Sequence, residues 1–384
     1  MADRRPIRAL LVATATATTA GGEKHVADLL RGLPGHGIEV GLVAPAGGDL
    51  ADLVAELGVR AWQAPIGHGM SAAGLSAVKR AIADFEPDVV HAHGTRAAMF
   101  ARLADPRASQ RVIYAVHGIH VDKAGSRARQ TAFLAVERAL RPRTARFVTG
   151  AESDIDKGAR LRILDRDRAL TVYNGIELPQ RPGVPGRFRE ECGVGPDAPV
   201  LLCAGRFHEQ KDHATLLAAF ALVLQECPEA HLALVGSGEL EGALRERAVA
   251  LGVSGSVTFL PPRPDFSDAY TDSDVVVLSS RWEGLPYVVI YAMAHGKPVV
   301  STWVDGIPEA VIDGKTGLLV PPEDPVALAA ALARVVDDPA LASEMGAAGA
   351  RVAAERFSVD RMVADIAGVY GEVVDEQSRG ESGR

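Results

Sequence analysis

The sequence has few cysteines, few aromatic residues and no long run of apolar residues. Its three cysteines, Cys192, Cys203 and Cys227, are an odd number without metal-site spacing, which predicts reduced thiols in a cytoplasmic protein. No apolar run reaches the roughly 20 residues that span a bilayer, so membrane contact is expected to be peripheral at most, at the inner membrane surface. The dinucleotide-binding pattern GxGxxG is also absent. These features leave an ordinary globular protein of 384 residues, long enough for two domains.

The charge is divided unevenly along the chain. Residues 1–176 hold 24 lysines and arginines against 18 acidic residues, whereas residues 177–384 hold 17 against 31, within a net charge of −8. A basic half and an acidic half suggest different tasks. The acidic half is a poor candidate for binding nucleic acid, and no nucleic-acid partner is expected.

Early arginines followed by an apolar run at residues 7–13 allow two interpretations of the N-terminus: a signal peptide or a first buried strand. The glycines Gly21 and Gly22 and the amphipathic segment after them favour the strand.

Short β-branched runs alternate with helix-length segments along the whole chain. This alternation predicts an α/β protein with parallel sheets covered by helices on both faces. The expected strands are residues 7–13, 39–43, 59–64, 88–92, 111–116, 146–149 and 170–173, then 200–204, 230–235, 257–260, 275–279, 298–301 and 317–320.

A Pro/Gly-rich segment, residues 178–186, interrupts the alternation and is predicted to link two doubly wound domains. The predicted domains are residues 1–177 and 178–356, followed by a helix over residues 357–376; residues 377–384 are expected to be disordered. Ligands of such sheets bind beyond the C-terminal ends of the strands, so the cleft between the domains is the expected active site.

A carboxylate, Glu283, stands on a loop that leads directly into an apolar helix ending at Gly296. Backbone amides at a helix N-terminus attract anions, and a carboxylate beside them can hold sugar hydroxyls. Earlier in the same half, Gly205 is followed by Arg206 and Lys211. These two cations can converge on a diphosphate, although a solvated loop is the alternative.

The Glu283 loop resembles the donor-site signature of the retaining glycosyltransferases of family 4 (glycosyltransferase group 1). The resemblance implies a GT-B fold, in which two Rossmann-like domains face each other across a cleft. It places Arg206 and Lys211 in the family's diphosphate clamp. Donor contacts are expected from Gly205, Leu260, Glu283, Gly284, Leu285, Pro286, Tyr287 and Tyr291. Gly21 and Gly22 precede the first expected helix, where they either let the backbone approach a ligand phosphate or serve simply as turn residues. Tyr291 departs from the family, which has a second glutamate at this position.

In the first half, the step His117-Gly118 resembles the family's His-Gly step, whose histidine lies near the donor sugar and the scissile bond. A structural histidine is the alternative. His91 and His93 alternate on the preceding expected strand; without a third metal ligand, packing or a role in the acceptor cleft is favoured.

Three further motifs have weaker signals. The segment from Asp305 to Glu309 looks like the family's Gly-Ile-Pro-Glu turn beside the donor pocket, and Asn174-Gly175 matches its Asn-Gly hinge. The acidic pairs Asp165/Asp167 and Asp272/Asp274 have a spacing that could hold Mg²⁺, but surface or capping roles are favoured and no metal site is predicted.

Residues 123–168 are dense in arginine. One interpretation is a solvated helical face balanced by aspartates. The other is attraction to an anionic membrane or a lipid-diphosphate acceptor.

The resemblance implies metal-independent transfer of a sugar, with retention of configuration, from a nucleoside diphosphate, with a UDP-linked hexose or N-acetylhexosamine expected. His117, Arg206, Lys211 and Glu283 are the expected catalytic residues, and no separate cofactor is expected. The acceptor is expected to be a hydroxyl compound, either a lipid-linked saccharide in polysaccharide assembly or a small soluble natural product. A sugar-phosphate epimerase and a non-catalytic nucleotide-sugar binding protein are the alternatives.

Overall fold

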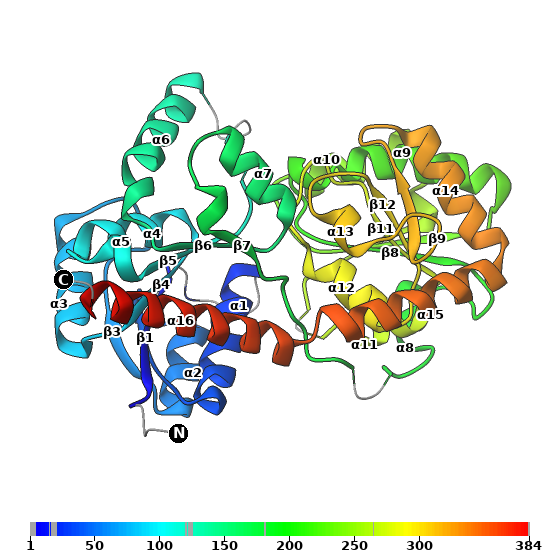
Figure 1. Cartoon of the computed structure of the whole chain (residues 1–384). Helices are drawn as coiled ribbons and strands as arrows, with labels where there is room; N and C mark the ends of the chain where they lie inside the picture. The colour runs from blue at the N-terminus through cyan, green and yellow to red at the C-terminus, as the bar shows by residue number, and fades with distance from the viewer. Residues whose placement is uncertain are drawn as a thin grey trace. The chain divides into compact units, whose positions relative to one another are not determined.

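The structure is a computed structural model that describes residues 5–14, 16, 21–119, 121, 126–179, 182–263 and 265–382. The chain forms two compact units (Figure 1). One consists of residues 1–175 together with residues 359–384, and the other of residues 176–358. Among the described residues, no helix is both long and apolar enough to cross a membrane.

The first unit is built on a seven-stranded parallel sheet with the order β3-β2-β1-β4-β5-β6-β7. Its strands are β1 (Ile7–Val12), β2 (Ile38–Ala44), β3 (Arg60–Gln63), β4 (Val89–His93), β5 (Val112–Val116), β6 (Arg146–Thr149) and β7 (Ala169–Thr171). Its α-helices are α1 (Gly21–Gly32), α2 (Asp49–Leu57), α3 (Ala72–Phe85), α4 (Gly94–Ala104), α5 (Ala108–Arg111), α6 (Arg127–Leu140), α7 (Glu152–Arg160) and α16 (Val359–Ser382), with 3₁₀ turns at η1 (Leu33–His36), η3 (Arg141–Arg143) and η4 (Arg166–Arg168).

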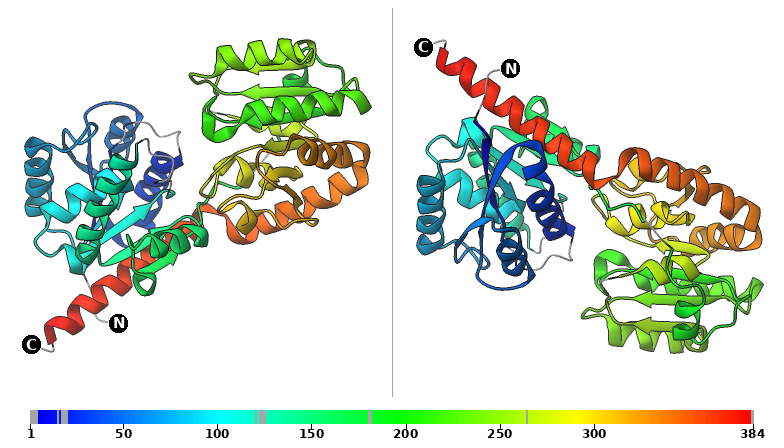
Figure 2. Two further views of the ribbon diagram at one scale, coloured as in Figure 1. Left: turned by 90° about the horizontal axis from the view of Figure 1, so that it is seen from above. Right: turned by 90° about the horizontal axis from the view of Figure 1, so that it is seen from below.

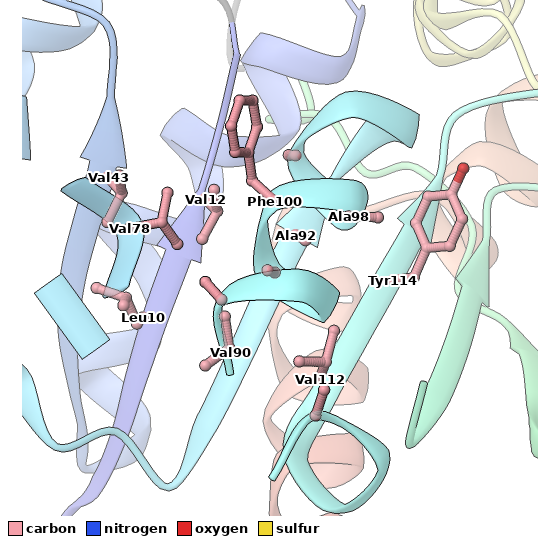
Figure 3. Close-up of a cluster of buried hydrophobic side chains, with 14 of the residues drawn as sticks. Leu10, Val12, Val43, Val78, Val90, Ala92, Ala98, Phe100, Val112 and Tyr114 are labelled. Carbon is pink, nitrogen blue, oxygen red and sulfur yellow. The ribbon is translucent and has the colours of Figure 1, made fainter. Parts of the chain in front are cut away.

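Alternate residues of these strands enter two different cores because successive side chains of a strand point to opposite faces. On one face, Leu10 and Val12 pack with residues of α3 and α4, including Phe100 (Figure 3). On the other face, Ala9 and Leu11 pack with α1, α2 and α16. The sheet is therefore buried on both sides, as expected for parallel strands.

Helix α16 returns the chain to the first unit. It runs beside that unit in both views of Figure 2, and its residues Met362, Ile366 and Tyr370 are fully buried in the core with β1. The expectation of a disordered tail is wrong for the described part of residues 377–384. Helix α16 continues to Ser382, and the amide of Gln377 donates hydrogen bonds to the carbonyl oxygens of Asp88 and Gln110, which hold this end of the helix in place.

The second unit has a six-stranded parallel sheet with the order β10-β9-β8-β11-β12-β13. Its strands are β8 (Val200–Ala204), β9 (His231–Val235), β10 (Val257–Leu260), β11 (Val275–Leu278), β12 (Val299–Thr302) and β13 (Gly317–Val320). Its α-helices are α8 (Arg187–Cys192), α9 (His213–Glu226), α10 (Glu241–Ala250), α11 (Ser267–Asp272), α12 (Tyr287–Ala294), α13 (Ile307–Ala310), α14 (Pro325–Asp337) and α15 (Pro339–Arg356), with 3₁₀ turns at η5 (Glu209–Lys211) and η6 (Ser254–Ser256).

Both sheets reverse their strand order at one place, between β1 and β4 in the first and between β8 and β11 in the second. Loops that follow the two strands at such a point diverge to opposite faces and leave a crevice where ligands bind. The prediction of two doubly wound α/β domains is confirmed. The residues that follow β8 and β11 are therefore where a ligand of the second unit is expected.

Candidate functional site

The loops after β8 and β11 bring Lys211 and Glu283 into contact. The ammonium group of Lys211 pairs with Oε1 of Glu283, although 72 positions separate the two residues. Both side chains are largely buried, with 16% of Lys211 and 6% of Glu283 exposed. An ion pair withdrawn from water is costly unless further hydrogen bonds satisfy it, so the neighbours of the carboxylate matter.

Two neutral donors also hold the Glu283 carboxylate. The hydroxyl of Ser280, which is fully buried, donates to Oε1 at 2.7 Å, and the amide of Gln210 donates to Oε2 at 3.3 Å. The sequence analysis missed both residues. The position of Ser280 directly after a predicted buried strand could have indicated a site residue. No comparable sequence feature pointed to Gln210.

The backbone of the Glu283 loop is fixed by a second carboxylate. Oδ2 of Asp305 accepts a hydrogen bond of 2.8 Å from the backbone amide of Glu283. Asp305 has a φ of 45°, a left-handed conformation that is uncommon outside glycine. Asp305 begins the turn that leads into α13, so this turn reaches the Glu283 loop.

Arg281 ties the same loop to the 3₁₀ turn that carries Lys211. Its backbone amide donates to the carbonyl of Gln210 at 2.8 Å, and its Nε lies 3.2 Å from Oδ2 of Asp212. Asp212 also caps α9 by accepting from Thr215. The Lys211–Glu283 pair is therefore supported by backbone and side-chain contacts on both loops.

Arg206 is the second cation of this edge. Its side chain is exposed and forms no ion pair with any residue that the structure describes. Gly205 before it lies under Lys211: a Cβ at Gly205 would come within 3.3 Å of Cε of Lys211. The glycine thus gives the lysine side chain room to cross the loop toward Glu283.

Helix α12 begins directly after the Glu283 loop, as predicted. Gly284, Leu285 and Pro286 connect the two, and Leu285 is buried under the loop. The amides of the first turn of α12, from Tyr287 onward, are the groups that a helix presents to an anion.

Tyr291 lies one turn further along α12. Its ring stacks on that of Tyr270 with centroids 6.4 Å apart and an interplanar angle of 19°, and Tyr270 stacks in turn on His295 at 4.8 Å. Burial, with Tyr291 nearby, raises the pKa of Tyr270. The tyrosine at the departing position thus packs against the buried ring of α11.

Leu260 ends β10, two strands from β8, and its carbonyl accepts the amide of Gly236 at 2.9 Å. It lies on the C-terminal edge of the sheet, as do Gly205 and Glu283.

In the first unit, the structure brings His117 and the start of α1 together. Gly22 lies in the first turn of α1 rather than before it, and a Cβ there would be 3.2 Å from Cδ2 of His117. Gly21 is the first residue of the same helix. Both therefore lie near the exposed imidazole that follows β5.

Three buried histidines surround His117. His93 stacks on it at 5.7 Å, and His25 meets it edge-on at 5.4 Å; His91 lies 4.2 Å from His93 and shares a hydrogen bond of 2.7 Å with Tyr370. Burial lowers the pKa of His91 to about 3 and holds the pKa values of His25 and His93 well below the usual value. The cluster is therefore neutral at physiological pH.

The side chain of Asn174, from the predicted hinge, lies near His25 and opposes part of the fall in its pKa. The next residue, Gly175, is the last residue of this part of the first unit. The motif is therefore tied to the histidine cluster as well as to the boundary between the units.

Most of the arginines between residues 138 and 168 have structural partners. Arg143 donates to the carbonyls of Arg102 and Asp105, Arg166 pairs with Glu152 and Asp156, and Arg146 pairs with Glu376 of α16. Paired guanidinium groups attract an anionic surface less strongly than unpaired ones. Arg127, Arg129, Arg160 and Arg162 of the same segment are exposed and form no ion pair with a described residue, so the membrane interpretation of this segment stays a prediction.

Only one of the two acidic pairs has a capping contact. Asp272 accepts from the amides of Gly186 and Phe188 at the start of α8, whereas Asp165 makes no capping hydrogen bond at η4 and instead pairs with Arg141 and Arg168. Asp272 is buried, not at the surface. Within the described ranges, no group of three or more histidine, cysteine or acidic side chains is arranged to hold a metal ion.

The sequence profile described as "Glycosyltransferase Family 4" matches residues 19–180, and that described as "Glycosyl transferases group 1" matches residues 198–338. The chain belongs to this glycosyltransferase family. It is 31% identical to "D-inositol 3-phosphate glycosyltransferase 2" of Catenulispora acidiphila, over 94% of this chain and 92% of that protein. It is 33% identical to the "D-inositol 3-phosphate glycosyltransferase" of Streptomyces avermitilis, over 74% of this chain and 65% of the relative.

The fold of this family 4 member is also that of solved glycosyltransferases. The crystal structure of Anabaena HepE in complex with UDP and glucose superposes with a TM-score of 0.82, covering 95% of this chain and 99% of HepE at 19% identity. At this identity the likeness shows the GT-B fold and no more. The family resemblance and the fold predicted from the sequence are both confirmed.

Proposed function

We propose that the chain transfers a hexose or N-acetylhexosamine from a UDP-sugar to a hydroxyl acceptor with retention of configuration. The observation that carries the proposal is the contact of Lys211 with Glu283 at the switch point of the second sheet. It puts a cation for a diphosphate beside a carboxylate for a sugar, on the edge where α/β sheets bind ligands. UDP complexes of HepE, with the same fold, support this donor.

The reaction needs negative charge to be stabilised on the departing diphosphate. The bond from the anomeric carbon to the diphosphate oxygen breaks, and its electron pair leaves with UDP. Lys211, the exposed Arg206 and the first amides of α12 are the groups assigned to that charge, which requires no metal ion. The acceptor oxygen attacks the same face of the sugar, and its proton passes to the departing phosphate oxygen.

Glu283 is assigned to the hydroxyls of the donor sugar. While no donor is bound, Lys211 neutralises it, and Ser280 and Gln210 can hold the carboxylate when Lys211 turns to the phosphate. Among the described residues, the carboxylate that contacts the Glu283 loop is Asp305, and it accepts from the backbone amide of Glu283 and is therefore assigned to holding the loop rather than to a nucleophile. Attack on the same face within an ion pair is therefore favoured over a covalent intermediate.

A small soluble acceptor is favoured over a lipid-linked one. Six of the ten arginines between residues 127 and 168 have partners within the first unit, which reduces the charge available to an anionic membrane. The relatives named as D-inositol 3-phosphate glycosyltransferases are consistent with such an acceptor. His117 lies beside Gly22 and is assigned to the space between donor sugar and acceptor.

The test is single-turnover incubation with UDP-glucose, UDP-galactose and their N-acetylamino forms, followed by release of UDP and proton NMR of the new anomeric centre. Release of UDP with an α-linked product is expected. An inverted product would exclude retention. Tight binding of a UDP-sugar with no turnover by any acceptor or water would identify a non-catalytic binding protein instead.

A further inference from the structure

A cavity of about 160 Å³ lies inside the first unit, between the sheet and α6. Its walls are mostly apolar and come from β5, β6, α6 and the residues after α7; they include Tyr114, Val116, Phe133, Phe147, Ile163 and Leu164. An apolar cavity of roughly 150 Å³ in another protein stays dry and binds benzene. The size and walls of this cavity therefore suit one aromatic ring.

The outer wall of the cavity is loosely packed. Helix α6 buries only Glu137 and Leu140 among its described residues, and it projects from the body of the first unit in Figure 1. A buried ion pair of 2.8 Å between Arg102 and Glu137 fixes its C-terminal half. The N-terminal half of α6, which carries Phe133, buries little apolar surface. Little packing therefore holds it in place, and a ligand can enter the cavity beside it.

The cavity has one polar corner. The hydroxyl groups of Thr95 and Tyr114 lie 2.9 Å apart on its wall. The guanidinium group of Arg102 lies 5.0 Å from the centre of the Tyr114 ring, which stands at the margin of the core cluster in Figure 3. Burial raises the pKa of Tyr114, so its hydroxyl stays protonated and can donate. A ring that bears one hydroxyl or ether oxygen matches this corner.

The cavity lies next to His117, the residue assigned to the space between donor sugar and acceptor. Gly118, the residue after His117, is part of its wall. Thr95 lines both this cavity and an open hollow of about 410 Å³ that includes Arg96, Met70 and Met99. The cavity and the hollow therefore adjoin at Thr95, and the cavity wall reaches the residue next to His117.

We infer that this cavity binds an aromatic ring of the acceptor, and that the acceptor is an aryl or phenolic compound rather than a bare sugar or cyclitol. The inference rests on the proposed function, because it names the acceptor class of the same site. Three aromatic side chains, Tyr114, Phe133 and Phe147, supply the edge and face contacts that an aromatic guest prefers.

The test is saturation-transfer NMR of the full chain with 4-ethylphenol, with ethylbenzene and myo-inositol as comparison probes and no nucleotide sugar. Both aromatic probes are expected to bind and myo-inositol is not. Ile163→Phe, which fills the cavity, should abolish binding of both. Ala135→Phe, which adds the same side chain at an exposed position of α6, should leave it unchanged.

Tyr114→Phe keeps the ring and removes the hydroxyl, so it is informative even if the filled variant fails to fold. This substitution should lower the affinity for 4-ethylphenol by about tenfold and leave the affinity for ethylbenzene unchanged. No aromatic binding to the native chain, or binding that Ile163→Phe leaves intact in a folded protein, would overturn the inference. Release of UDP from a UDP-sugar, measured on the same samples, reports the donor site separately. Turnover without aromatic binding defeats this inference alone. Aromatic binding without turnover defeats the proposed function and the acceptor role of the ring, and leaves the cavity only as a binding site for an aromatic ring.

Discussion

The ammonium group of Lys211 lies against the carboxylate of Glu283, and Ser280 donates to the same carboxylate oxygen. Lysine and glutamate therefore neutralise each other while the neutral hydroxyl stays in place. A bound diphosphate would compete with Glu283 for the lysine. This competition gives the pair a direct experimental signature.

Lys211→Ala should lower turnover by roughly 10²–10³-fold, because one donor to the developing charge is lost. The measurement is steady-state release of UDP by the purified variant, with its fold checked by circular dichroism. Lys315→Ala, which removes an exposed lysine of the same unit, is the matched control and should keep native turnover. A folded Lys211→Ala protein with near-normal turnover would remove the assigned role.

Activity should persist in excess EDTA. The charge on the leaving diphosphate is assigned to Arg206, Lys211 and backbone amides, which chelation does not affect. The assay is UDP release before and after dialysis against the chelator. Complete loss of activity that Mg²⁺ or Mn²⁺ restores would show that the reaction uses a metal ion.

Tyr291→Glu should tighten binding of a UDP-sugar. A carboxylate can accept hydrogen bonds from both ribose hydroxyls, and one charge-assisted contact contributes on the order of 1.5–3 kcal/mol. Isothermal calorimetry should show a smaller effect on inorganic diphosphate, which has no ribose. Equal or weaker affinity for the nucleotide sugar would mean that this position does not contact the ribose.

The same change should lower the melting temperature, because Tyr270 loses its stacked partner. Such ring pairs contribute about 0.5–1.5 kcal/mol beyond their buried area. Tyr291→Phe keeps the ring and should retain native stability. A stability loss shared by both variants would instead point to the hydroxyl.

The free energy of unfolding should fall as the pH drops below about 6.5. Burial lowers the pKa of His91 to about 3 and also lowers those of His25 and His93, so the unfolded chain binds more protons than the folded one between these values and the ordinary histidine pKa. The stability they contribute is present above the ordinary value and is lost on acidification. Urea unfolding between pH 4.5 and 7.5 measures the slope.

The variant for this prediction is His93→Phe, which keeps an aromatic ring but removes one titrating group. Burial also lowers the pKa values of His117, His213, His231 and His295, so the pH slope of this variant should be smaller by roughly a seventh if all seven histidines contribute equally. His36→Gln changes an exposed histidine and should leave the slope unchanged. An unchanged slope in His93→Phe would show that the buried cluster does not cause the acid sensitivity.

Sequence periodicity predicted the sheets well because parallel strands buried on both faces read as short apolar runs. Strands β6, β8, β10 and β13 have the predicted bounds. The other strands differ by one or two residues at one or both ends, where hydrogen bonding rather than composition sets the limit. Helix α15 was not named. Its alanine- and glycine-rich surface has little periodicity, and it is helical in part because it packs on α12.

Sequence analysis could predict only those residues of the site that belong to a local sequence motif. Glu283, Arg206 and Lys211 could be predicted because each lies on a loop that follows a strand. The pairing of Lys211 with Glu283, however, depends on a contact across 72 positions. The hydrogen bond between His91 and Tyr370 spans 279 positions. No local sequence pattern encodes contacts between residues so far apart in the chain. These contacts follow from the order of the strands in each sheet, which in turn depends on how the helices pack.

Helix α16 has a consequence for the order in which the protein matures. Residues 176–358 are contiguous and can close their core while the ribosome still holds the last helix. The first sheet cannot bury Ala9 and Leu11 fully until Ile366 and Tyr370 have been synthesised. The first unit is thus synthesised first but completes its core last. Until α16 packs on it, its sheet exposes an apolar face that chaperones can recognise.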